Sequence, residues 1–216
     1  MMASPEQTLL DSYGLSGLVH VWGQAGSGKT LFASLLAADE SRLNHVLWIS
    51  TDGKLHFASR LKELVRLRNG SASNITIVSA LGHVEANQAV FTVRERLRSD
   101  TRLVVVDPIT RVLDMEHVDD LMWGRNLFEE TMPVLAALCS SGERTVVIIS
   151  EVRESETGAA AVHHDTISRW ASHDLELRRD PGSAETEVLA QRNGQSTTSI
   201  LRFGYDKSGL RVVRRS

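Results

Sequence analysis

The chain is poor in the features that mark several classes of protein. Its 216 residues include one cysteine, Cys139, four prolines and 5% aromatic residues. A single cysteine cannot form an internal disulfide, which excludes a disulfide-stabilised scaffold and suits a reducing cytoplasm. No apolar run is long enough to cross a bilayer, and the first residues lack the basic-then-apolar pattern of a signal peptide. We therefore expect a cytoplasmic protein with no membrane partner.

An excess of positive charge is also lacking. The net charge is −3 at neutral pH, so the chain as a whole offers no attractive field for nucleic acid. Any DNA binding would depend on a local basic patch. The hydrophobic content of 42% and the charged content of 24% are typical of a globular protein with a sizeable core.

The most informative stretch is residues 18–30. An apolar run over 18–22 predicts a strand, a helical apolar pattern follows, and the chain between them fits G-x-x-x-x-G-K-[ST] at every fixed position. Glycines let such a loop turn its N–H groups toward phosphate oxygens, and the helix N-terminus adds positive potential. Lys29 would reach the β- and γ-phosphates, and the Thr30 hydroxyl would hold Mg²⁺. The predicted nucleotide-binding residues in this stretch are Gly23, Gln24, Ala25, Gly26, Ser27, Gly28, Lys29 and Thr30.

A second motif ends the apolar run of residues 103–107. Four apolar residues precede Asp107, so the sequence predicts a buried strand with an acid at its carboxyl end. In a parallel sheet that end would lie beside the phosphate loop, where an aspartate can order a water on Mg²⁺. The alternative is an aspartate that begins a turn before Pro108. With the phosphate loop upstream, we favour the metal role for Asp107.

The pattern of predicted elements changes once along the chain. Up to residue 172, apolar runs alternate with helical spacing, which is typical of βα units around a parallel sheet. Beyond it, strand-like runs are separated by hairpin turn signals. We therefore predict an α/β fold with a mainly parallel sheet, flanked by helices, and a C-terminal antiparallel β-meander. The predicted strands are 18–22, 45–50, 75–78, 103–107, 145–150, 174–179, 185–191, 199–203 and 210–213, and the predicted helices follow residue 30 and cover 55–68, 85–98, about 126–139 and 167–171.

We expect residues 1–216 to form one domain, because the segment before the first strand is too short for another. The apolar residues of that segment either cap the core or pack over a nucleotide base, and we favour the first. Pro133 is expected to kink or split the helix around it. Residues 151–165 are interpreted as a mobile loop. A lead-in, a βα core and the meander would follow one another at 1–17, 18–172 and 173–216.

Together these motifs resemble the ATPase core of the RecA/RadA recombinase superfamily, a P-loop NTPase. The likeness covers nearly the whole chain, with residues 23–30 matching the Walker A motif and 103–107 the Walker B motif. Residues 48–53, followed by Arg60-Leu61, match the stretch that carries the family's catalytic glutamate. Residues 167–175 resemble the segment that re-enters the sheet after the second DNA-binding loop. The likeness is strongest to the short archaeal RadA paralogues, the RadB- and RadC-like proteins. The stretches 107–115, 123–125 and 150–153 resemble the RadC-type paralogues in particular.

The resemblance implies ATP and Mg²⁺ as cofactors, slow hydrolysis, and an accessory role in homologous recombination or DNA repair. Lys29 would act on the phosphates, while Thr30 and Asp107 would hold the metal. Asp52 would polarise the attacking water. Arg60 would lie against the adenine, although its spacing differs by one residue and an exposed helix arginine is the alternative. The implied partners are single-stranded DNA and a RadA-type recombinase.

Three departures from the family pattern matter. Asp52 is one methylene shorter than the usual glutamate, which displaces the carboxylate by ~1 Å and would cost roughly a hundredfold in rate. Glu151 stands where recombinases carry an amide that senses the γ-phosphate, and a carboxylate there is repelled unless a cation intervenes. Either Ser150 or Arg153 senses the phosphate instead, or Glu151 helps to activate the water. The chain also lacks the recombinase N-terminal domain and linker, so we expect a monomer or small homo-oligomer rather than a filament.

The loops that contact DNA in the family would lie near residues 112–125 and 151–166. Both contain more acidic than basic residues, and phosphate binding depends on cations, so they argue against strong DNA binding. The better basic surfaces are the helices at 55–68 and 85–98. We interpret His163-His164-Asp165 as loop rather than metal site, because no cysteine or further histidine lies at ligand spacing.

Two other functions remain open at this point. A KaiC-like signalling ATPase, or nucleotide-dependent switch, would share these motifs and bind no DNA. A degenerate paralogue would bind ATP without turnover and act as a scaffold. Turnover measured with and without single-stranded DNA separates the first from a recombination factor. Turnover of Asp52→Ala and Lys29→Ala tests the second.

Overall fold

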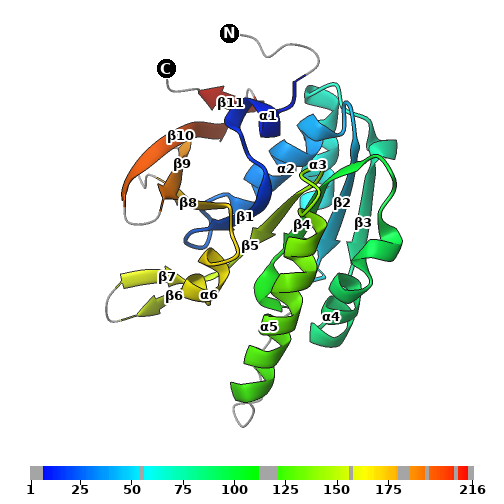
Figure 1. The fold of residues 1–216 in the computed structure, drawn as a ribbon. Coiled ribbons are helices and arrows are strands. Elements are labelled where there is room, and N and C mark those ends of the chain that lie inside the picture. The colour runs from blue at the N-terminus through cyan, green and yellow to red at the C-terminus, as the bar shows by residue number, and fades with distance from the viewer. Residues whose placement is uncertain are drawn as a thin grey trace.

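The computed structural model describes residues 7–53, 56–111, 121–155, 158–179, 185–192, 195–206 and 209–213. Over these residues the chain forms a nine-stranded sheet with helices on both faces and a separate two-stranded hairpin (Figure 1). None of the described helices is both long and apolar enough to cross a membrane. The strands are β1 (Gly17–Trp22), β2 (His45–Ser50), β3 (Ile75–Ser79), β4 (Thr101–Asp107), β5 (Thr145–Ile149), β6 (Val152–Ser155), β7 (Gly158–Ala161), β8 (His173–Arg179), β9 (Glu185–Arg192), β10 (Gln195–Asp206) and β11 (Gly209–Val213). The helices are α1 (Leu9–Tyr13), α2 (Lys29–Glu40), α3 (His56–Leu67), α4 (His83–Phe91), α5 (Leu121–Leu138) and α6 (His164–Ser168).

The large sheet has a parallel part and an antiparallel part. Its strand order is β11-β10-β9-β8-β1-β5-β4-β2-β3. From β8 to β3 every neighbouring pair is parallel. On the other side, β9 pairs antiparallel with β8, β10 with β9, and β11 with β10. This arrangement confirms the predicted α/β fold with a mainly parallel sheet and a C-terminal antiparallel meander.

The central strands are mostly apolar because helices cover both of their faces. On β4, Val105 belongs to the core cluster that packs against α1, α2 and α3. Its neighbours Val104 and Val106 belong to the second cluster, which packs against α4, α5 and α6. Successive side chains on a strand point to opposite faces, so one apolar run contributes to both cores.

Two predicted helices differ from those observed. The helix predicted at 85–98 is instead α4 followed by a 3₁₀ turn at Val93–Arg96. Thr92 ends α4, and its hydroxyl donates to the Gln88 carbonyl at 2.8 Å, which competes with continued helix. In α5, by contrast, the helix runs through Pro133 without splitting. Within residues 85–98, Val90 and Val93 are buried and Leu97 is half-buried against the same core.

The segment at 151–165 is not a loop throughout. Strands β6 and β7 pair as an antiparallel hairpin that stands apart from the large sheet, beside α6 (Figure 1). β6 is mostly polar and β7 is a run of small residues, so neither shows the apolar alternation that indicates a strand. Helix α6 begins at His164, three residues earlier than predicted.

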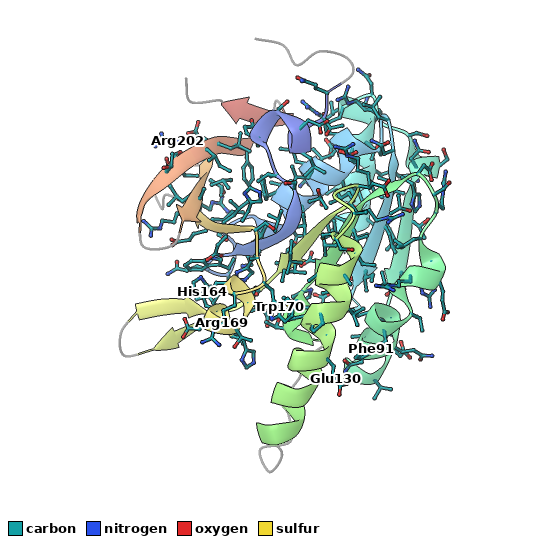
Figure 2. The ribbon with its side chains drawn as sticks, viewed as in Figure 1. Phe91, Glu130, His164, Arg169, Trp170 and Arg202 are labelled. Carbon is teal, nitrogen blue, oxygen red and sulfur yellow. The ribbon has the colours of Figure 1, made fainter. Side chains whose placement is uncertain are left out.

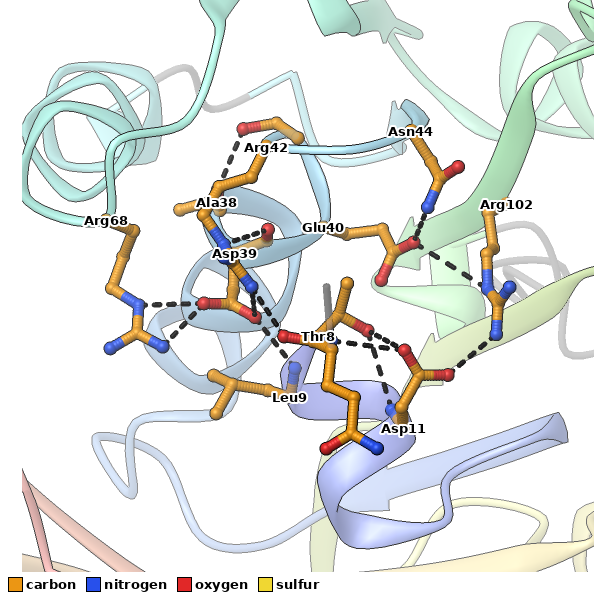
Figure 3. Close-up of polar contacts among 12 residues, drawn as sticks. Thr8, Leu9, Asp11, Ala38, Asp39, Glu40, Arg42, Asn44, Arg68 and Arg102 are labelled. Atoms are coloured by element: carbon orange, nitrogen blue, oxygen red, sulfur yellow. Dashed lines mark hydrogen bonds and ion pairs between the residues drawn. The ribbon is translucent and has the colours of Figure 1, made fainter. Parts of the chain in front are cut away.

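Two buried carboxylates at the C-terminal end of α2, those of Asp39 and Glu40, hold the segment around α1 against the helix (Figure 3). Asp39 accepts hydrogen bonds from the Leu9 amide at 2.7 Å and from Nε of Arg68 at 3.0 Å, and Arg42 lies 3.4 Å away. Leu9 and Leu10 of α1 are buried in the core. The lead-in therefore caps the core, as predicted, at the end of α2 opposite the phosphate loop.

Glu40, the next residue along α2, is fully buried. Nδ2 of Asn44 donates to it at 2.6 Å, and Arg102 lies 3.7 Å away. Burial raises the pKa of Glu40, while Thr8, Asn44 and Arg102 oppose the shift. Arg102 of β4 also donates to Asp11 of α1 at 2.7 Å. Its side chain therefore connects α1 with the C-terminal end of α2 (Figure 3).

Four parallel strands bring the predicted site residues to one edge of the sheet. β1 ends at the phosphate loop, β2 ends before Thr51-Asp52, β4 ends at Asp107, and β5 ends before Ser150-Glu151. The carboxyl ends of parallel strands are where open α/β sheets bind their ligands.

Candidate functional site

The phosphate loop, residues 23–28, joins β1 to α2. Gly28 is the N-cap of α2 and has φ +91°, a left-handed value that favours glycine. At Gly23, with φ +152°, a Cβ atom would lie 2.3 Å from the Leu177 carbonyl oxygen of β8. The first glycine of the motif is therefore required by close packing against a neighbouring strand as well as by the backbone conformation.

Lys29 is held over the loop by main-chain oxygens. Its Nζ donates to the Gly23 carbonyl at 2.6 Å and to the Gln24 carbonyl at 3.0 Å. Burial lowers the pKa of Lys29, while the nearby Asp107 and Glu151 oppose the shift. The ammonium group is thus positioned above the glycine-rich turn, where a bound phosphate would lie.

Thr30 and Asp107 meet directly. The Thr30 hydroxyl donates to Oδ2 of Asp107 at 2.8 Å, so the start of α2 touches the end of β4 across β5. Burial raises the pKa of Asp107 to about 6, with Asp52 and Glu151 adding to the shift and Thr30 and Lys29 opposing it. Among the described residues, two acidic groups and one cation, Lys29, act on this carboxylate, so its negative charge is not fully neutralised.

Two further carboxylates face Asp107 from adjacent strands. Asp52 follows β2, where the Ser50 hydroxyl lies 3.4 Å from its Oδ1. Glu151 follows β5, where Thr110 donates to its Oε2 at 3.3 Å. Oxygen donors gathered around an under-neutralised buried aspartate are the chemistry that Mg²⁺ prefers, so the residues present fit the predicted ion. Magnesium would be held by Thr30 and, through water, by Asp107.

A cavity of about 390 Å³ lies against the outer side of the loop. It is lined on one side by loop residues and on the other by β8, whose Arg179 donates to the Gly26 carbonyl at 3.3 Å. The predicted loop residues Gln24, Ala25 and Ser27 all contribute to its wall. The remaining lining residues are Trp22, Gly23, Val152, Glu176, Leu177 and Arg178.

The β8 wall of this cavity was absent from the sequence prediction. Thr186 of β9 reinforces the wall, because its hydroxyl donates to the Ser27 carbonyl at 3.0 Å. The only sequence signal was the alternation of charged and apolar residues over 173–179. That alternation predicts a half-buried strand but does not say which loop the strand contacts.

Three predicted residues lie elsewhere or cannot be placed at the phosphates. Arg60 is exposed on α3, near Glu63 at 3.3 Å, and is not among the described residues that line the cavity. Ser150 is buried, and its hydroxyl lies 2.8 Å from Nε2 of His20. The side chain of Arg153 lies outside the described part of the structure. The roles given to these residues remain predictions.

The two candidate DNA loops are only partly described. Residues 112–120 fall outside the described ranges, and so do the side chains of 121–129 and 153–160. The predicted acidic character of these loops therefore rests on the sequence alone. On the helices proposed as basic surfaces, Arg66, Arg94 and Arg96 are exposed.

Comparison with known proteins supports the fold. A solved structure titled as the RadB recombinase superposes with a TM-score of 0.72, covering 97% of this chain and 98% of that chain at 21% identity. No protein-family model and no curated protein sequence matches the chain. At this identity the likeness shows the fold. It confirms the predicted RecA-like architecture and the resemblance to RadB-like proteins at that level.

Proposed function

We propose that the chain binds Mg-ATP at residues 23–30 and hydrolyses it slowly, as an accessory factor in homologous recombination or DNA repair. The observation that carries the proposal is the 2.8 Å contact between the Thr30 hydroxyl and Asp107. It lies at the N-terminus of α2, beside a lysine held over a glycine-rich turn. Few arrangements other than a nucleotide triphosphate site require all of these groups together.

In this proposal each residue acts on a defined part of the ligand. Loop N–H groups and Lys29 bind the phosphates, and Thr30 and Asp107 hold the metal, which neutralises charge on the β- and γ-phosphates. Asp52 orients the attacking water and takes its proton. Because Asp52 is shorter than a glutamate, we expect the water to be held imperfectly and turnover to be slow. Glu151, at the end of β5, is the second candidate for the proton acceptor.

The proposed partners are single-stranded DNA and a RadA-type recombinase. Similarity in fold to a RadB recombinase supports this part of the proposal, and a monomer or small homo-oligomer is the expected assembly. The acidic composition of the two candidate DNA loops favours a different function, a KaiC-like nucleotide switch that binds no DNA. Both functions use the same nucleotide site.

Calorimetry with and without magnesium tests the nucleotide site directly. We expect ATP to bind with an affinity that depends on magnesium; absence of any such affinity for adenine or guanine triphosphates would overturn the proposal. Phosphate release should then be measured with and without single-stranded DNA at two salt concentrations, with mass recorded by light scattering. Stimulation that weakens steeply with salt supports the recombination role. Indifference to DNA, with nucleotide-dependent protein binding, supports the switch.

The role of Asp52 needs a separate experiment. Asp52→Ala should lower phosphate release by at least tenfold while ATP affinity stays within about threefold, because only the water loses its partner. Glu63→Ala, which removes an acidic side chain from α3, is the matched control. If Asp52→Ala turns over at the wild-type rate, the proton acceptor lies elsewhere, and Glu151→Gln becomes the variant to measure.

A further inference from the structure

A cluster of metal-binding residue types lies outside the nucleotide machinery. It consists of His20 on β1, Asp174 on β8 and His164 at the start of α6, which Figure 2 labels beside the β6–β7 hairpin. Nδ1 of His20 lies 2.9 Å from Oδ1 of Asp174, and Nε2 of His164 lies 2.6 Å from Oδ2 of the same carboxylate. All three donor atoms lie within 4.8 Å of one another.

The strand order explains why these residues meet. β1 and β8 are parallel neighbours, and their register places His20 directly beside Asp174. Helix α6 precedes β8 and brings His164 to the open side of the pair. His20 is fully buried, whereas the side chains of His164 and Asp174 are 27% and 12% exposed. A ligand could therefore enter from the His164 side.

His20 and Asp174 shift each other's pKa. Burial lowers the pKa of His20, although the hydrogen bond and charge of Asp174 oppose the shift. Burial alone would raise the pKa of Asp174, but the hydrogen bond and charge of His20, and then His164, hold it below its usual range. A neutral imidazole and an ionised carboxylate are the forms that coordinate a cation.

We propose that His20, His164 and Asp174 form a three-ligand site for a divalent transition metal of the zinc class. Two imidazole nitrogens and one carboxylate, with a fourth position open, are a ligand set that zinc uses. Zinc bonds of about 2.0–2.1 Å place tetrahedral donor atoms roughly 3.3 Å apart. The observed nitrogen–oxygen separations of 2.6 and 2.9 Å would have to widen toward this value, and the two ring nitrogens, within 4.8 Å of each other, would have to take up a similar spacing.

The outer contacts are those that orient metal ligands. The second ring nitrogen of His20, Nε2, lies 2.8 Å from the Ser150 hydroxyl. Trp22 Nε1 donates to Oδ1 of Asp174 at 2.9 Å, which fixes the carboxylate. Partners of this kind hold a ligating ring in one tautomer and one orientation.

Metal binding changes the tautomer and not the charge of the two rings. Without metal, Nδ1–H of His20 and Nε2–H of His164 donate to Asp174. With metal, each ring proton moves to the other nitrogen, which for His20 faces Ser150, and the freed lone pairs bind the ion. The Asp39 network differs here, because its partners are guanidinium groups, which keep their protons and cannot ligate. Two histidines on one carboxylate are therefore convertible into a metal site, whereas two arginines are not.

The test is zinc binding to the full chain after dialysis against a chelator. We expect one zinc ion per chain, measured by competition with a chromophoric chelator, and a tetrahedral visible spectrum when Co²⁺ replaces it. His164→Ala should weaken zinc binding by at least about a hundredfold, since it removes a ligand. The matched control is His163→Asn, which keeps a residue tolerant of the left-handed backbone, with φ 57°, at that position.

Two further variants separate this site from zinc uptake at the nucleotide site and from a loss of folding. Asp107→Asn should leave zinc affinity unchanged, because it alters only the nucleotide site. Asp174→Asn should abolish binding, and circular dichroism will report whether that variant folds; if it does not, His164→Ala decides the question alone. The proposal is overturned if the wild-type chain takes up no stoichiometric zinc, if His164→Ala titrates like His163→Asn, or if only Asp107→Asn loses the ion.

Discussion

A buried aspartate lies at each end of α2, Asp39 in its last turn and Asp107 of β4 against Thr30 in its first turn, and the two are neutralised in different ways. At the C-terminal end, Asp39 is in contact with two arginines and a main-chain amide (Figure 3). At the N-terminal end, Asp107 accepts one hydroxyl and faces the acidic residues Asp52 and Glu151. One carboxylate is satisfied by the chain itself, and the other is left to be neutralised by something else.

This difference distinguishes a structural contact from a binding site. A buried carboxylate paired with guanidinium groups fixes two segments together and offers no vacancy for a ligand. A buried carboxylate among other carboxylates costs free energy in the folded chain, and a divalent cation recovers that cost on binding. Mutation of Asp39 at the C-terminal end should therefore lower the stability of the fold and leave ligand affinity unchanged. Mutation of Asp107 at the N-terminal end should raise the stability and weaken ligand binding.

The largest expected effect is on ligand affinity at the N-terminal end. Lys29→Ala should weaken Mg-ATP binding by roughly a hundredfold or more, because it removes the cation that contacts the β- and γ-phosphates. Calorimetry measures the loss. Lys62→Ala, at an exposed lysine of α3, is the control and should bind as wild type. Equal affinities in the two variants would mean that Lys29 does not contact the phosphates.

The next effect is on stability at the C-terminal end. Asp39→Ala should lower the free energy of unfolding by about 3 kcal/mol, because Arg68, Arg42 and the Leu9 amide lose a buried partner. Urea unfolding measures this loss, and Mg-ATP affinity should stay within about twofold. Asp100→Ala breaks an exposed pair with Arg98 and should cost less than about 1 kcal/mol. A large loss of ATP affinity in Asp39→Ala would contradict the proposed division between the two ends.

Asp107→Asn should have the opposite sign in stability. The pKa of Asp107 is raised from 3.8 to about 6, so protonation stabilises the nucleotide-free fold below pH 3.8, and this contribution is lost as the pH rises to 6. Above pH 6 the variant should therefore be more stable than wild type by about 1–3 kcal/mol. It should also lose the magnesium dependence of ATP binding. In the wild type, that dependence should weaken as the pH falls through 6, because the metal needs the ionised form.

Urea unfolding of both proteins between pH 4.5 and 8 gives the stability difference as a function of pH. The stability advantage of Asp107→Asn over wild type should grow as the pH rises toward 6 and then level off. Asp100→Asn, at an exposed carboxylate, controls for the change in net charge. A difference that is flat with pH would mean that Asp107 titrates normally in the fold.

The smallest effect concerns the wall of the cavity. Arg179→Ala should weaken Mg-ATP binding by about threefold, because an exposed cation near the loop contributes little after solvent screening. Arg66→Ala, an exposed arginine on α3, should leave affinity unchanged. Competition with a fluorescent nucleotide resolves changes of this size. A loss as large as that of Lys29→Ala would place Arg179 in direct contact with the phosphates.

The parts of the fold that could be predicted from the sequence depend on local patterns. The phosphate loop is a contiguous motif, and the central strands are apolar runs because they are buried on both faces. The end of β4 at Asp107 follows from the same run. Each of these features could be located without knowing which strand lies beside which.

The parts that could not be predicted depend on strand order. Leu177 and Arg179 contact the loop, and Asp174 contacts His20, only because β8 is added next to β1. No local pattern specifies that neighbour. The break of α4 at Thr92 was missed for another reason, since a side-chain hydrogen bond to the helix backbone leaves the apolar spacing unchanged.

The packing of β8 and β9 against the phosphate loop has a consequence for biosynthesis. Thr186 contacts Ser27 across a sequence separation of 159 residues, so the loop is translated well before its supporting strands. A ribosome-bound nascent chain would hold the loop residues without the wall that shapes them. Nucleotide affinity should consequently arise only when β9 leaves the exit tunnel, and a chain released before that point should not compete for cellular ATP.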